Sequence, residues 1–187
     1  MDRQGRKKDE DIDARFIFYW IAFNSAYSAI QTSQYFDTER RIYKDFFEKI
    51  LKYDKNEHVY NAIWKEFSGP VRSLLNNQYI FGPFWNFQNG REGFDDWEVK
   101  FNESKSIALK ALQNKNTLMI LEILFDRLYT LRNQILHGGA TWNSKVNRSQ
   151  VQDGQSIIGF LIPNFLQIMM DNQNENWGKL VFPVVEI

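Results

Sequence analysis

Apolar residues recur at spacings of three and four along most of the chain, which is the pattern of amphipathic helices. In the segment 12–31 one such stripe consists of Phe16, Trp20, Phe23, Tyr27 and Ile30. The same pattern, with capping and helix-stopping residues at several ends, predicts further helices over 38–53, 59–67, 70–76, 104–113, 117–137 and 157–170. The sequence therefore predicts an all-α bundle of about five to seven helices.

Three segments depart from this pattern. Periodicity disappears over 77–101, where turn dipeptides lie among many aromatic residues. We expect an aromatic-rich inserted loop there, either a lid pinned to the bundle by its own rings or a loop that stacks on a substrate. Pro163 predicts a kink or a split in the last helix. Residues 172–187 are expected to form an extended C-terminal tail, because the strand-like run 180–185 has no obvious partner strand.

Composition adds limits on domain number and location. The 187 residues are 43% hydrophobic, with 23 Lys+Arg against 23 Asp+Glu, which predicts a single domain over 1–187 behind a charged, disordered lead-in at 1–11. The absence of cysteine excludes disulfides and thiolate zinc sites and favours a cytoplasmic protein. No apolar run approaches the ~20 residues of a spanning helix, and no apolar signal-peptide region occurs, so neither membrane insertion nor secretion is expected.

The end of the predicted central helix, 117–137, carries the candidate chemistry. Asp126, Thr130, Asn133 and His137 follow at spacings of four, three and four, which places them on one helical face. Arg132 projects about 100° from Asn133, and its guanidinium can flank the same pocket as His137. A permanent cation beside an imidazole that exchanges protons near neutral pH suits a phosphate undergoing proton transfer.

The charge pattern around this helix end points the same way. The segment 127–148 contains four basic residues and no acidic one. Trp142, Asn143, Lys145 and Arg148 are therefore candidates to hold a nucleic-acid backbone and stack a base. A structural explanation stays open, because cations near a helix C-terminus complement the helix dipole and His137 before Gly-Gly can cap the last carbonyls. We expect neither a metal site nor a cofactor, since His58 lies on another helix and the carboxylates are scattered.

The string Arg132-Asn133-Gln134-Ile135-Leu136-His137, at the end of a late helix, resembles the signature of the HEPN superfamily. Two more blocks occur in the matching order. Residues 18–27 are similar to the opening helix of stand-alone bacterial HEPN proteins, and 137–148 are similar to the segment after their histidine. The resemblance extends from about residue 12 to the Pro-Val-Val-Glu ending, so it covers nearly the whole chain.

The resemblance implies a metal-independent endoribonuclease in which two domains pair so that their motifs face one cleft. His137 would move a proton at the ribose 2′-hydroxyl or the leaving 5′-oxygen, Arg132 would neutralise the phosphate, and Asn133 would orient one of them. RNA is then the substrate and a homodimer the working form. Proteins of this kind occur in toxin-antitoxin and phage-defence systems, which implies an antitoxin or defence partner. Gly139 stands where some such toxins carry a tyrosine that is adenylylated, so that form of silencing is not expected.

Two alternatives remain at the level of sequence. The chain could be a HEPN module that binds RNA or a nucleotide without cleaving it, or a structural or regulatory dimer whose motif seals an interface. Two further residues are candidates for a supporting role. Thr130 shares the motif face, and Asn24 places an amide on the core-facing stripe of the first helix. That amide could support Arg132 or His137, or simply satisfy backbone groups.

Overall fold

The computed structural model describes residues 11–28, 39–138, 145 and 147–178. Over these ranges all regular structure is helical, which confirms the predicted all-α bundle. The α-helices are α1 (Ile12–Ser28), α2 (Glu39–Tyr53), α3 (His58–Asn61), α4 (Ser68–Leu75), α5 (Gly82–Gln88), α6 (Trp97–Gln113), α7 (Thr117–His137) and α8 (Arg148–Asp171). A π-helical segment (Ala62–Glu66) continues α3, and a 3-10 helix (Gln78–Ile80) precedes α5.

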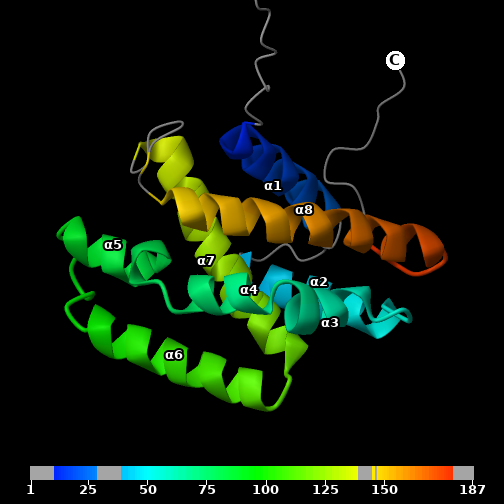
Figure 1. Ribbon diagram of the computed structural model, residues 1–187, viewed down its shortest axis with the longest axis horizontal. Helices are drawn as coiled ribbons and strands as arrows, with labels where there is room; N and C mark the ends of the chain where they lie inside the picture. The colour runs from blue at the N-terminus through cyan, green and yellow to red at the C-terminus, as the bar shows by residue number, and fades with distance from the viewer. Residues whose placement is uncertain (1–10, 29–38, 139–144, 146, 179–187) are drawn as a thin grey trace, which may run out of the picture.

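The helices pack around α7, which crosses the middle of the molecule (Figure 1). Helices α1 and α8 lie against each other on one side, while α2 and α4 contact α7 from another. Helices α5 and α6 project to one side of the bundle, and α6 packs on α7. The face of α7 that carries the candidate motif is therefore bordered by α5 and α6.

A cluster of tilted aromatic rings lies at the centre of the core. Phe125 of α7 is fully buried at its centre, with ring centroids 4.5 Å from Phe23 and 4.8 Å from Phe47. Phe165 of α8 lies 6.3 Å from Phe125 and Trp20 of α1 lies 6.2 Å away. Four helices thus share one aromatic cluster, which is why so many phenylalanines are needed for a bundle of this size.

Two glycines of α8 allow its close approach to α1. A methyl group placed on Gly154 would lie 2.9 Å from Leu128 Cδ2 and 3.1 Å from Phe16 Cε2. One placed on Gly159 would lie 2.8 Å from Tyr19 Cε2. The distances of 2.9 and 2.8 Å are shorter than carbon atoms tolerate without displacement. The space at Gly154 is thus filled by Leu128 of α7 and Phe16 of α1, and the space at Gly159 by Tyr19 of α1.

The predicted limits of α7 are confirmed. The side chain of Asn116 accepts a hydrogen bond from Met119 N at 3.1 Å and caps the first turn. At the other end, Gly138 has φ of 90°, a left-handed conformation that glycine adopts without strain and that ends the helix after His137. The motif therefore occupies the last two turns of α7.

The last helix differs from the prediction. Helix α8 begins at Arg148, nine residues before the expected start, and it continues through Pro163 as one helix. Pro163 lies on the exposed face, where water can satisfy the carbonyl of Gly159, while its neighbours Ile162 and Phe165 are buried. Burial of the opposite face holds the helix together across the missing hydrogen bond.

The aromatic-rich segment 77–101 is not the structureless loop that the sequence predicts. It contains the 3-10 helix and α5, and α6 begins at Trp97 instead of residue 104. Phe81, Trp97 and Phe101 form a small second core with Phe84 packed against it. The rings thus pin this segment down, as the lid hypothesis required, but they do so by building helices.

The remaining predictions concern the termini and the membrane. The described part of the tail follows the bundle, since Trp177 Nε1 donates to Asn172 O at 2.9 Å and its ring lies 5.9 Å from that of Tyr53. The run 180–185 and the lead-in 1–10 lie outside the described residues. Within the described helices, none combines the length and apolarity needed to cross a membrane.

Candidate functional site

The predicted polar face of α7 lines a groove. Asp126, Thr130, Asn133 and His137 all border an open hollow of about 890 Å³, as their spacing of three and four requires. Thr130 Oγ1 donates to the carbonyl of Asp126, one turn earlier in the same helix, at 3.2 Å. His137 is exposed at the C-terminal end of this wall.

The opposite wall comes from the segment that the sequence describes as an aromatic loop. Trp85 and Asn86 of α5 line the groove, followed by the C-cap residue Asn89, Arg91 and Phe94. Pro83 stands in the first turn of α5, where its fixed backbone angle starts a helix. The pair Gly82-Pro83, one of the turn dipeptides expected in this segment, is therefore a helix start. The three-residue spacing of Asn86 and Asn89 was the signal in the sequence that could have indicated that both line one wall.

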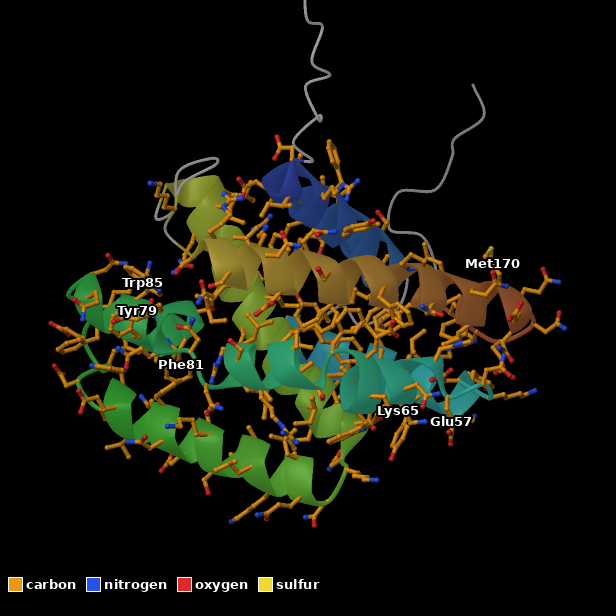
Figure 2. All side chains as sticks on the ribbon, viewed as in Figure 1. Glu57, Lys65, Tyr79, Phe81, Trp85 and Met170 are labelled. Carbon is orange, nitrogen blue, oxygen red and sulfur yellow. The ribbon has the colours of Figure 1, made fainter. Side chains whose placement is uncertain are left out.

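Gln134 joins the two walls and was missed by the sequence argument. Its side chain is 7% exposed; Nε2 donates to Tyr79 O at 2.6 Å, and Oε1 accepts from Asn147 Nδ2 at 3.0 Å. Trp85 Nε1 donates to the same Tyr79 carbonyl at 2.7 Å. One backbone oxygen thus anchors both α7 and the indole of α5. Figure 2 shows Tyr79 and Trp85 together at the α5 end of the molecule.

Arg132 reaches the groove only through its neighbour. The guanidinium Nη1 donates to Asn133 Oδ1 at 2.8 Å, and Arg132 itself does not line the hollow. Its side chain is half-buried, and it makes no ion pair with any residue that the structure describes. Asn133 therefore holds the cation at the rim, beside the wall that carries His137.

The basic stretch 127–148 does not form one surface patch. Arg127 is 1% exposed: its guanidinium lies 4.5 Å from the Phe81 ring centroid, and Nη2 donates to Ser104 Oγ at 2.8 Å. Arg148 Nη2 lies 2.8 Å from Oδ2 of the buried Asp13. Both cations thus have structural partners. The Arg148 side chain is still 30% exposed, and its contact with a nucleic-acid backbone stays a prediction.

The other predicted residues fall in different places. Lys145 is exposed beyond the end of α7, whereas Trp142 and Asn143 lie outside the described residues. Asn24 lies on α1 next to Phe23, whose ring contacts Phe125 of α7. Asn24 Oδ1 is buried and accepts no hydrogen bond from a described residue, so its supporting role stays a prediction.

A second, smaller hollow continues along the same face of α7 toward its N-terminus. It has a volume of about 340 Å³ between α6 and α7, and it shares Asp126 and Pro83 with the groove. Glu103 and Glu122 also line it. Burial raises the pKa of the Glu122 carboxyl; Lys44 opposes this shift, and Glu48 adds to it. Along this face of α7, carboxylates thus line the hollow nearer the N-terminus, and His137 lines the groove at the C-terminus.

The raised pKa of Glu122 predicts a pH-dependent stability effect. Because its pKa is raised in the folded state, the protonated Glu122 carboxyl stabilises the fold at low pH. This stabilisation is lost as the pH rises through the folded-state pKa. We expect Glu122→Gln to raise the unfolding free energy at pH 7 by roughly half a kcal/mol, a small gain because much of the group faces water. Near pH 4 the gain should vanish, as thermal melts at both values would show. Glu103→Gln is the matched control, and an equal gain at both pH values would contradict the prediction.

Comparison of the chain with protein-family models, curated proteins and solved structures found no match.

Proposed function

We propose that the chain is a metal-independent endoribonuclease of the HEPN type that acts as a homodimer in the cytoplasm. The observation that carries the proposal is the arrangement at the end of α7. His137 stands exposed on the groove wall, Asn133 stands one turn before it, and the guanidinium of Arg132 is fixed to Asn133 at 2.8 Å. A proton-transfer group, an amide and a permanent cation thus lie within two helical turns.

These three groups suit attack of a ribose 2′-hydroxyl on the adjacent phosphate. The new bond joins the 2′-oxygen to phosphorus, and the bond from phosphorus to the 5′-oxygen breaks. The 2′-hydroxyl proton passes to a base, and the 5′-oxygen receives a proton from an acid. The products are a 2′,3′-cyclic phosphate and a 5′-hydroxyl. His137 serves one of the two proton transfers, and Arg132 neutralises the charge that builds up on phosphorus-bound oxygens.

A second copy would supply the other proton-transfer group. One histidine cannot serve as base and acid at the same instant, so a pair of motifs completes the reaction. Leu136, the residue before His137, is 46% exposed and offers an apolar side chain for a protein contact beside the motif. An antitoxin or another defence component is the second kind of partner that the proposal includes.

Replacing Arg132 tests the proposal. We expect Arg132→Ala to slow cleavage of total RNA about 10²- to 10³-fold, because the charge developing on the phosphate loses its cation. The reaction is followed in the presence of a chelator by the appearance of 2′,3′-cyclic phosphate ends. Arg72→Ala, at an exposed arginine of α4, removes the same charge elsewhere and should cut at the original rate. Intact RNA in every sample, with RNA still bound to the protein, would favour a binding module that does not cleave.

A further inference from the structure

The wall that α5 contributes to the groove has no part in the chemistry described above. It nevertheless presents an aromatic ring and two amides to the same hollow as His137. Asn86 of α5 and Asn89 at its C-cap both line the groove with Trp85. An indole flanked by amides is the combination with which proteins hold an unstacked base.

The position of Trp85 relative to His137 is fixed by hydrogen bonds. Trp85 Nε1 and Gln134 Nε2 donate to the same oxygen, the carbonyl of Tyr79, at 2.7 and 2.6 Å. His137 follows Gln134 by three residues on α7, which is a rise of about 4.5 Å. The indole edge is therefore held across the groove within about one helical turn of the histidine.

The amides on both walls have capacity for a ligand. The side chains of Asn86 and Asn89 make no hydrogen bond with the residues that the structure describes, although both line the groove. Asn133 Oδ1 accepts from Arg132, which leaves its Nδ2 hydrogens for another acceptor. Three amides facing one hollow can donate to and accept from the edge of a base.

The charges along α7 set the direction in which an RNA strand could lie. Asp126 stands at one end of the groove wall, and Glu103 and Glu122 line the hollow that continues from it. Lys100 also lines that hollow, but three carboxylates outnumber it, so this end disfavours phosphate. His137 stands at the other end, with Arg132 at the rim. A phosphate at His137 therefore leaves the attached base to extend toward the middle of the groove, where the indole of α5 is anchored.

We propose that α5 and α7 form a nucleobase pocket in which the base beside the scissile phosphate stacks on Trp85 and is read by Asn86, Asn89 and Asn133. This inference rests on the ribonuclease function proposed above and adds its substrate class. Only an unpaired base can enter a groove between two helices, so the pocket selects single-stranded RNA. The amides give the cut site a base preference, which a purely electrostatic contact with the backbone would lack.

Binding of short RNAs tests the pocket separately from cleavage. Fluorescein-labelled ten-nucleotide adenylate, cytidylate and uridylate are titrated with the His137→Ala protein, and the anisotropy gives each Kd. Adding Trp85→Ala should weaken binding of the preferred RNA roughly 5- to 100-fold, the range for loss of one stacked base. Trp85→Phe keeps a ring but loses the hydrogen bond to Tyr79 O that positions it, so its Kd should lie between those of the unaltered ring and Trp85→Ala. Gln88→Ala, on the exposed side of α5, is the matched control.

The amide variants test base reading. Asn86→Ala combined with Asn89→Ala should change the ratio of the Kd values for the best and worst RNA by about 5-fold or more. Equal weakening for all three RNAs would overturn base reading, and a Trp85→Phe protein as weak as Trp85→Ala would overturn stacking. Cleavage that persists with unaltered base preference in the amide variants refutes the pocket and leaves the nuclease. Trp85-dependent binding without any cleavage by the unaltered protein refutes the nuclease and leaves the pocket.

Discussion

His137→Ala is expected to remove the release of 2′,3′-cyclic phosphate ends from RNA, with a fall in cleavage rate of about 10²- to 10⁴-fold. The imidazole is the group on the groove wall that can both accept and donate a proton at the reacting oxygens. His137 is exposed and ends α7, so its replacement leaves the core intact. Total RNA incubated with a chelator and analysed for cyclic ends gives the measurement.

The chain supplies its own control for this experiment. His58, at the start of α3, is the other histidine of the chain, and it lines neither hollow along α7. His58→Ala should therefore cut RNA at the original rate. The mass of both variants in solution should equal that of the unaltered protein, which separates loss of chemistry from loss of pairing. A His137→Ala protein that cuts as fast as His58→Ala would rule out the proposed role of the imidazole.

Phe125→Ala is expected to lower the free energy of unfolding by about 3–5 kcal/mol. The ring is fully buried and contacts Phe23, Phe47 and Phe165, so its loss removes contacts with three other helices at once. The neighbours belong to rigid helices, and they cannot collapse completely into the space that the ring leaves. Urea unfolding followed by circular dichroism gives the change.

An exposed phenylalanine on α1 provides the comparison. Phe18 is 68% exposed in the single chain, so Phe18→Ala should change the unfolding free energy by no more than about 0.5 kcal/mol in dilute monomer. A Phe125→Ala protein whose stability falls by no more than that of Phe18→Ala would mean that the core repacks around the missing ring. Such a result would contradict the shared aromatic cluster described here.

The central helix could be predicted from the sequence because local signals agree there. Its apolar period, its cap at Asn116 and its stop at Gly138 all lie within the segment itself. The motif face follows from helix geometry alone, and so Thr130, Asn133 and His137 were predicted to lie together. Where a feature depends only on the spacing within one long helix, the sequence is sufficient.

The opposite wall of the groove could not be predicted in this way. Helix α5 has only seven residues, too few for an apolar period to be distinguished from a loop. It forms because Phe81, Phe84 and Trp97 pack on one another, and these contacts join residues from separate elements. Gln134 was overlooked for a similar reason, since its partner, the carbonyl of Tyr79, lies 55 residues away.

Local charge was the least reliable guide. Arg127 and Arg148 contribute two of the four cations in the basic stretch, but their partners come from α6 and α1. A sum over neighbouring residues cannot distinguish a cation enclosed by the fold from one that meets solvent. Asn24 is a different case: its Oδ1 is buried and accepts no hydrogen bond from a described residue, so neither of the two roles considered for it is decided.

The two glycines of α8 have a consequence for evolution of the fold. Gly154 faces Phe16 and Gly159 faces Tyr19, five and three residues apart on their respective helices. Each ring fits where a side chain is missing, so together they fix how far α1 can slide along α8. Divergent descendants that keep this helix pair should change these positions jointly: a larger residue at 159 with a smaller one at 19, and a larger residue at 154 with a smaller one at 16 or 128.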